Sequence, residues 1–221
     1  MSHDAAPRAE VGERRLPMAL AVLTLMGLAL VSPAGLSLLP GWVLAAVEGA
    51  LLLALMLGDP GRIDRQSRWL RLTSFALVAV ILVSTLTVTV LLLYGLLIGS
   101  EVTQNAVNVL VAGGKVWLGN NVAFALLYWQ FDCGGPAARA HGMPKYPDFA
   151  FPQQLNPELA PPGWRPEFID YLYIGFTNAN AFSPTDTMPM AHWAKLAMGT
   201  QALISFAIIG LVIARAVNLF A

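Results

Sequence analysis

Long apolar runs separated by short polar links restrict the fold of this chain more than any other feature. The sequence has 221 residues, of which 57% are hydrophobic and 12% are charged, whereas soluble domains carry about 25% charged residues. The apolar runs approach the ~20 residues that a helix needs to cross the hydrocarbon core of a bilayer. Because backbone groups inside a bilayer must be hydrogen-bonded internally, the runs predict an all-α integral membrane protein.

Five apolar segments are predicted to cross the membrane, each bounded by turn-forming or charged residues. The predicted spans are residues 17–31, 41–57, 72–98, 106–129 and 193–220. The fourth span is the least regular, because Gly113, Gly114 and Lys115 interrupt its apolar run.

Four regions follow one another along the chain. Residues 1–15 are polar and are predicted to form a disordered cytoplasmic tail. Residues 16–129 form a four-span membrane region, and residues 130–166 form a polar, Pro-rich connection. Residues 167–221 contain a short helix followed by the final span.

The distribution of Lys and Arg predicts the orientation in the membrane. Arginines precede the first span and recur between the second and third spans, whereas residues 32–40 and 99–105 contain neither Lys nor Arg. The positive-inside rule therefore places the amino terminus, the basic loop and the 130–166 connection on the cytoplasmic side of a bacterial inner membrane.

The basic loop carries an arginine at every third position. These residues are Arg62, Arg65, Arg68 and Arg71. The spacing resembles that of a voltage-sensor helix, but Asp64, Gln66 and Ser67 are too polar for a buried sensor. We interpret the loop as a surface segment that contacts anionic lipid, with Trp69 and Leu70 dipping into the interface.

Two charged residues fall inside the predicted spans. Glu48 lies near the centre of the second span, and Lys115 lies at comparable depth in the fourth. A charge at that depth costs roughly 2.5–3.5 kcal/mol on insertion scales, so it needs a partner or a function. We expect a Glu48–Lys115 ion pair, which is either purely structural or part of a proton or ion relay.

Uncharged polar residues also lie within the last two spans. They are Asn120, Asn121, Gln201 and Ser205. Interhelical hydrogen bonding is the first interpretation of these residues. The second is that they line a cavity together with the polar segment that precedes the last span.

A short amphipathic helix is predicted directly before the last span. Pro166 suits the first turn of a helix, and Glu167 and Asp170 suit its positive end. Apolar residues then recur at three- and four-residue spacing, at Phe168, Tyr171, Leu172, Gly175, Phe176 and Ala179. A helix of about four turns is too short to span a bilayer, so it either re-enters the membrane or covers the bundle as a lid.

Polar residues cluster at the end of this helix and beyond it. They are Thr177, Asn178, Asn180, Ser183, Pro184, Thr185 and Asp186. Polar side chains at membrane depth need partners, water or ions, which favours a water-exposed conduit. The alternative is a dry helix-turn-helix lid, in which Ser183 caps a helix, Pro184 takes its first position and Asp186 completes an analogue of a capping box.

Residues 170–186 resemble the pore helix and filter of the potassium-channel superfamily. In that family the filter reads Thr-Val-Gly-Tyr-Gly-Asp, and the same register here gives Ala181-Phe-Ser-Pro-Thr-Asp186. Glycine permits the backbone that such a filter needs, and Pro184 fixes its own φ, so a standard potassium filter is not expected. The resemblance implies a homo-tetramer around a pore axis. It also implies entry from the outer face, whereas the loop charges place this segment on the cytoplasmic side.

The chain more closely resembles a family of uncharacterised bacterial membrane proteins of unknown function. The shared features include the basic loop, the Phe124-Ala-Leu-Leu-Tyr-Trp129 end of the fourth span, the Asp170-Tyr-Leu-Tyr173 helix and the Val217-Asn218-Leu219 end. The resemblance covers most of residues 17–221 and is specific in residues 167–221. It implies a fold and no activity.

No constellation typical of an enzyme is present in the sequence. Cys133 is the single cysteine, and His3, His141 and His192 lie far apart, so neither a metal site nor a cofactor is expected. A net charge of zero gives no reason to expect nucleic acid as a partner. The leading prediction is a channel-like or transport protein with a divergent, non-potassium-type filter. The alternative is a non-conducting subunit that binds lipid or partner proteins, as a homo-oligomer or in a larger membrane complex.

Overall fold

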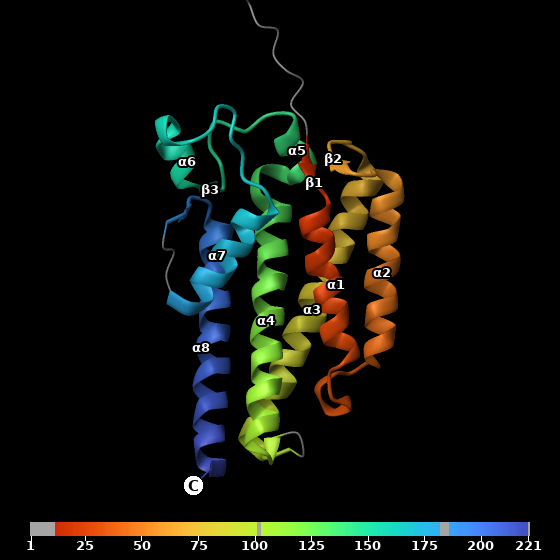
Figure 1. Cartoon of the computed structure of the whole chain (residues 1–221), viewed down its shortest axis with the longest axis vertical. Helices are drawn as coiled ribbons and strands as arrows, with labels where there is room; N and C mark the ends of the chain where they lie inside the picture. The colour runs from red at the N-terminus through yellow and green to blue at the C-terminus, as the bar shows by residue number, and fades with distance from the viewer. Residues whose placement is uncertain (1–11, 101–102, 182–185, 221) are drawn as a thin grey trace, which may run out of the picture.

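The computed structural model describes residues 12–100, 103–181 and 186–220, in which helices predominate and the strands are four two-residue segments (Figure 1). Four helices are long and apolar enough to cross a membrane: α2 (Gly41–Gly58), α3 (Arg68–Ile98), α4 (Ala106–Phe131) and α8 (His192–Phe220). The structure therefore confirms the prediction of an all-α protein, and its four long apolar helices suggest an integral, multi-pass membrane protein.

The first predicted span is a shorter helix than the other four. α1 (Leu16–Leu30) has 15 residues, which corresponds to about 22 Å of axial length, whereas the hydrocarbon core is about 30 Å thick. α1 packs against α2 and α4. Its apolar character follows the prediction, but its length falls below that of a helix that crosses the core unaided.

Short elements connect the long helices. The strand β1 (Glu13–Arg14) pairs antiparallel with β2 (Arg62–Ile63), and β3 (Phe149–Ala150) pairs with β4 (Met188–Pro189). Between α4 and the last two helices lie η3 (Asp132–Gly134), α5 (Pro136–Ala140), α6 (Pro152–Leu155) and η4 (Pro157–Leu159). η1 (Ala34–Leu36) lies in the turn between α1 and α2.

The start of α1, the α2–α3 loop and the 130–166 connection lie at one end of the bundle, at the top of Figure 1. We name this the basic end, because the arginine-rich loop belongs to it. The α1–α2 turn and the end of α8 lie at the opposite end. The predicted disorder is wrong for residues 12–15, because Glu13 lies in a strand and Arg15 is buried. The rest of the predicted tail lies outside the described residues.

α4 is the central helix and packs against α1, α3, α7 and α8. Asn105 caps it by accepting hydrogen bonds from the backbone N–H groups of Val107 (2.9 Å) and Asn108 (3.2 Å). The predicted interruption at Gly113 is wrong, because the helix runs through it without a break. A Cβ atom on Gly113 would lie 2.6 Å from Val212 of α8. The glycine is therefore a packing residue that lets two helices approach closely.

α7 (Phe168–Ala181) starts at the basic end, descends beside α4 and α8, and stops part of the way along them (Figure 1). After α7 the chain returns toward the basic end, where the start of α8 lies. The buried face of α7 consists of Phe168, Tyr171, Ile174, Gly175, Asn178 and Ala179. The predicted apolar stripe is thus correct along the helix except at Phe176, which is exposed.

Large apolar side chains remain exposed along the outer faces of the long helices. Examples are Leu53 and Leu57 on α2, Val83, Val90 and Leu97 on α3, and Leu203, Phe206 and Val217 on α8. Apolar surface this extensive is uncommon on a soluble monomer and suits contact with lipid chains.

We predict that Gly113→Ala destabilises the protein by about 1–3 kcal/mol, because the added methyl group must displace Val212. Gly114→Ala is the matched control, since no atom lies within 4 Å of a Cβ there and alanine favours a helix over glycine by about 1 kcal/mol. Thermal unfolding in detergent micelles measures both variants. Equal melting temperatures would show that the close approach of α4 and α8 contributes nothing.

Candidate functional site

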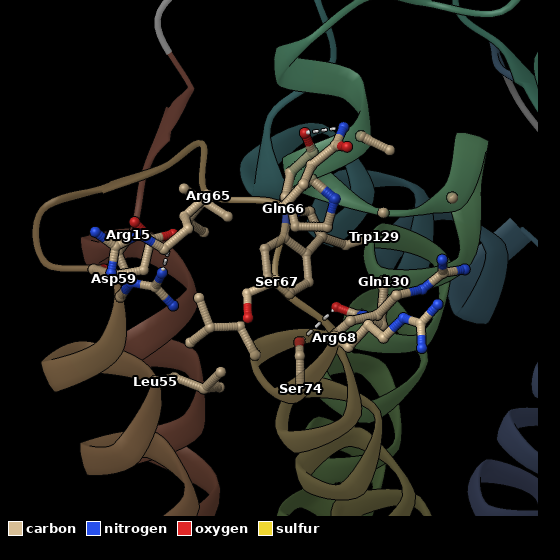
Figure 2. Close-up of a pocket in the computed structure, with 18 residues that line it drawn as sticks. Arg15, Leu55, Asp59, Arg65, Gln66, Ser67, Arg68, Ser74, Trp129 and Gln130 are labelled. Atoms are coloured by element: carbon tan, nitrogen blue, oxygen red, sulfur yellow. Dashed lines mark hydrogen bonds and ion pairs between the residues drawn. The ribbon is translucent and has the colours of Figure 1, made fainter.

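A cavity of about 310 Å³ opens at the basic end, between the ends of α2 and α4 and the start of α3 (Figure 2). Its apolar wall consists of Leu55, Ile63, Leu70, Trp129 and Pro136. The volume is at the lower end of the range of small-molecule sites in proteins, about 300–1,000 Å³. Four arginines also line it, and we name it the arginine cavity.

The four arginines differ in how their charge is compensated. Arg15 forms an ion pair with Asp59 (Nη2 to Oδ2, 3.0 Å), and its Nε donates to the carbonyl oxygen of the same residue (2.9 Å). Arg65 donates to a backbone carbonyl oxygen at the end of α2 (2.8 Å). Within the described ranges, Arg65, Arg68 and Arg71 form no ion pair with a carboxylate. Three uncompensated positive charges therefore surround the cavity.

The first turn of α3 adds to the positive potential. Ser67 is the N-cap residue of this helix, but its side chain makes no capping hydrogen bond. The first backbone N–H groups of a helix lack acceptors inside the helix and carry a partial positive charge. Phosphate and carboxylate groups bind favourably at such an end.

An amide group faces the cavity from its floor. Gln130 is 3% exposed, and its Oε1 accepts a hydrogen bond of 2.6 Å from Oγ of Ser74 (Figure 2). The Nε2 group of Gln130 has no hydrogen-bond partner in the part of the chain that the structure describes. The donor is therefore available to an acceptor inside the cavity.

The arginines predicted to contact lipid divide into two groups. Three of them line the cavity, whereas Arg62 lies outside it and donates to the carbonyl oxygen of Gly12 (2.9 Å). Trp69 is half exposed, as an interfacial residue would be. The same prediction is wrong for Leu70, which is buried in the core because it begins the inward face of α3.

A buried carboxylate joins four elements at the basic end. Oε1 of Glu13 accepts a hydrogen bond from Nε1 of Trp129, and Oε2 accepts one from the backbone N–H of Phe168 (3.0 Å). Nη2 of Arg139 lies 3.7 Å from Oε1. Burial raises the pKa of Glu13 to about 7, although Arg139 and the two N–H donors oppose the shift. One side chain thereby connects β1, α4, α5 and α7.

Asp132, Cys133 and Asp148 bring their potential ligand atoms within 4.8 Å of one another. Every carboxylate oxygen of this trio already accepts a hydrogen bond. Asp132 accepts from a backbone N–H of β3 (3.2 Å) and from the hydroxyl of Tyr171. Asp148 accepts from the N–H of Cys133 (2.8 Å) and from Nε1 of Trp193 (3.0 Å). The hydrogen bonds of the trio hold the 130–166 connection against α7 and α8.

Amide groups join α7 to α4 and α8. Oε1 of Gln201 accepts hydrogen bonds from the hydroxyl of Tyr128 (2.7 Å) and from Nδ2 of Asn178 (2.8 Å). Its Nε2 donates to the carbonyl oxygen of Gly175 (2.9 Å). All of these side chains are buried. The predicted polar residue Asn178 is therefore paired within one chain.

The other members of the predicted polar cluster are not gathered around it. Thr177 and Asn180 donate to carbonyl oxygens of their own helix (both 2.9 Å). Asp186 accepts from the hydroxyl of Tyr173 (3.2 Å) on an exposed face. Three predicted residues, Ser183, Pro184 and Thr185, lie outside the described residues.

The interpretation of the polar residues in α4 and α8 as interhelical hydrogen-bond partners is confirmed. Nδ2 of Asn120 donates to Oγ of Ser205 (3.1 Å). Gln201 also reaches Oδ1 of Asn121, at a longer distance of 3.5 Å.

The predicted ion pair between Glu48 and Lys115 does not form. Nζ of Lys115 donates to the carbonyl oxygen of Val31 (3.2 Å), and none of the ion pairs among the described residues includes Glu48. The carbonyl groups at the end of α1 are a competing acceptor, because a helix carboxyl end attracts cations. Both charged side chains line a second, smaller cavity.

Comparison with models of protein families, with curated proteins and with solved structures finds no match for this chain. The two family resemblances therefore stay predictions. Sequence reasoning missed Trp129, Gln130 and Ser74. The three-residue spacing of Arg71 and Ser74 places both residues on one face of α3, so it could have indicated Ser74. Only the packing of α4 against α3 brings Trp129 and Gln130 to this face.

We predict that the protein becomes less stable as the pH rises to about 7. The pKa of Glu13 is 4.5 in its ordinary state and about 7 when buried, so the folded protein binds this proton more tightly. The resulting stabilisation is complete below pH 4.5 and is lost as the pH passes about 7, with a total of about 3 kcal/mol. Glu13→Gln should flatten this dependence, whereas Glu158→Gln, at an exposed site that does not act on Glu13, should not. Thermal unfolding in detergent over this pH range measures the stability of each variant. Parallel curves of melting temperature against pH for the wild type and Glu13→Gln would contradict the prediction.

Proposed function

We propose that this protein is a bacterial inner-membrane protein that binds the headgroup of an anionic lipid in the arginine cavity. One observation carries the proposal. Three arginines without carboxylate partners surround a cavity with an apolar wall, at the end of a membrane-type helix bundle. Cations beside an apolar surface suit a molecule that is anionic at one end and apolar at the other.

The parts of an anionic lipid match the parts of the cavity. Guanidinium groups bind phosphate oxygens through parallel N–H donors, and the start of α3 adds partial positive charge. Gln130 offers a further donor from the floor. The wall formed by Leu55 and Leu70 suits the glycerol group and the first acyl carbons. A soluble phosphate would use the cations and leave this wall exposed to water.

The packing of α7 supports a protein that does not conduct. Asn178 and Gln201 satisfy one another within the chain, and the buried face of α7 lies on α4 and α8. Under this proposal α7 is a lid that packs against α4 and α8 on the side of the bundle.

The proposed topology has five spans, with α1 as the additional one, and places the amino terminus in the cytoplasm. The arginine-rich loop and the cavity then face the cytoplasmic leaflet. Anionic lipids give that leaflet its negative surface potential, which is worth about 1 kcal/mol for each Lys or Arg near the surface. The proposed ligand is therefore abundant where the cavity would meet it.

The triple variant Arg65→Gln, Arg68→Gln, Arg71→Gln tests lipid binding. We expect its affinity for phosphatidylglycerol to fall by about 3 kcal/mol, or about 100-fold, because three cations are lost. Arg62→Gln is the matched control, since this arginine belongs to the same loop but lies outside the cavity. Native mass spectrometry of the purified protein with phosphatidylglycerol, and with phosphatidylcholine for comparison, measures the affinities.

Two outcomes would contradict lipid binding at this site. In the first, the triple variant retains phosphatidylglycerol as well as Arg62→Gln does. In the second, the wild type binds phosphatidylcholine equally well, which would assign the binding to apolar contacts alone.

A channel-like transporter is the second candidate function. The observation that favours it is the position of Asn180, a polar, exposed residue near the tip of a helix that enters the bundle from one end and returns. A pore of this kind would need several chains around an axis, four by resemblance to potassium channels.

Ion flux from proteoliposomes separates the two candidates. We expect the wild-type protein to give no more flux than protein-free liposomes, because the buried amides of α7 are paired within the chain. A flux that Asp186→Ala abolishes would instead establish a conduit that includes the end of this segment.

A further inference from the structure

A second cavity, of about 60 Å³, lies within the bundle near the α1–α2 turn. It extends from Ser32 and Ser37, which are half-buried at the turn, to Glu48 on α2. Glu48 lies seven residues beyond Gly41, where α2 starts, which places it about 10 Å along the helix axis. We name this the Glu48 cavity. It shares no lining residue with the arginine cavity.

The carboxyl group of Glu48 is buried and incompletely paired. The residue is 2% exposed, and its Oε2 atom is buried without a hydrogen-bond partner. The hydroxyl of Ser84 lies beside the carboxyl group, and it also donates to the carbonyl oxygen of Ile81 (2.9 Å). A buried carboxylate oxygen without a partner is costly, so a group in this position calls for a proton or for water.

Lys115 is the charged group that faces Glu48 across the cavity. Its Nζ donates to the carbonyl oxygen of Val31, so the two charges share one cavity without touching. Among the described residues, the part of the lining that comes from α1 is apolar apart from Ser32 at its end, and α3 contributes Ser84, Thr85 and Val88. None of these residues titrates near neutral pH.

We propose that the Glu48 cavity is a hydrated protonation site inside the membrane, reached from the α1–α2 turn. The cavity has room for about two water molecules. A hydronium ion at the turn would give a proton to the water in the cavity, and that water would give a proton to Oε2 of Glu48, which leaves neutral water and a neutral carboxylic acid. The reverse step returns the proton to water.

A proton fits this site better than a metal ion does. The ammonium group of Lys115 would repel a second cation in the same small space. A neutral Glu48 instead removes the attraction between the two side chains and leaves Lys115 held by the end of α1. The arrangement therefore has two charge states that differ by one proton.

Infrared spectroscopy of the full-length protein in lipid nanodiscs tests the proposal. The difference between the wild type and Glu48→Gln isolates the carboxylic acid band of Glu48. We expect this band to grow as the pH is lowered from about 9 to about 5, a range that covers carboxyl groups in proteins. We also expect it to shift in D₂O, because water in the cavity exchanges.

A matched pair of glycine variants tests the route through the cavity. Gly119 lines the Glu48 cavity, and a Cβ there would lie no closer than 3.9 Å to any neighbour, so Gly119→Ala fits and narrows the space. Gly114→Ala adds a methyl group to open space on the same helix. We expect D₂O exchange at Glu48 to slow several-fold in Gly119→Ala and to stay unchanged in Gly114→Ala.

Three outcomes would overturn the proposal. They are the absence of any Glu48-dependent band over this pH range, a band that does not respond to D₂O, and equal exchange in the two glycine variants. If Glu48→Gln does not fold, labelling of the wild type with dicyclohexylcarbodiimide replaces the difference spectrum. The proposal then expects an adduct at Glu48, mapped by peptide mass spectrometry, whose rate of formation falls as the pH rises. Lack of an adduct at any pH would reject it.

Discussion

Burial of the Glu13 carboxylate is the interaction on which the basic end of the molecule depends. Its two oxygens accept hydrogen bonds from Trp129 and Phe168 while Arg139 approaches one of them. Arg139 in turn donates to the carbonyl oxygens of Trp129 (2.8 Å) and Asp132 (2.7 Å) and lies over the ring of Tyr171. The start of α7 and the wall of the arginine cavity are thereby positioned by the same residue. The carboxylate of Glu13 thus helps to position the end of α4 and the start of α7, which are distant from it in the sequence.

The polar residues of α7 form buried hydrogen bonds with the neighbouring helices. Asn178 has its donors taken by Gln201 and by the carbonyl oxygen of Met198 (2.9 Å). Nε2 of Gln201 donates hydrogen bonds to the carbonyl oxygen of Gly175 in α7 and to Oδ1 of Asn121 in α4. Inside a low-dielectric bundle, such paired amides hold helices in one register, and breaking the pairs would leave several buried groups unsatisfied.

The features that the sequence could predict are those encoded within one segment. Apolar runs determine where the long helices lie, and the arginine spacing indicates a basic loop at one end of the bundle. Interhelical bonding through Asn120 and Ser205 was also predictable, because a polar side chain in a span has few other partners.

The features that could not be predicted depend on which faces of separate helices meet. Equal depth for Glu48 and Lys115 does not bring them into contact, since the end of α1 offers Lys115 a nearer acceptor. Gly113 breaks an apolar run in the sequence, but in space it is a contact point for Val212. Gln130 and Ser74 lie 56 residues apart and form the floor of one cavity only after α3 and α4 pack.

The short length of α1 distinguishes it from the other apolar helices. α1 spans about 22 Å and the 29-residue α8 about 44 Å. If α1 crosses the membrane, as the proposed topology has it, a bilayer would thin beside this short helix while a long helix tilts, and each ångström of mismatch would cost a fraction of a kcal/mol. Thinning next to α1 would draw lipid headgroups toward the start of this helix, where Arg15 and the arginine cavity lie. The membrane around the protein would then be uneven, with its shallowest point beside the cavity, and lipids with shorter chains would gather there.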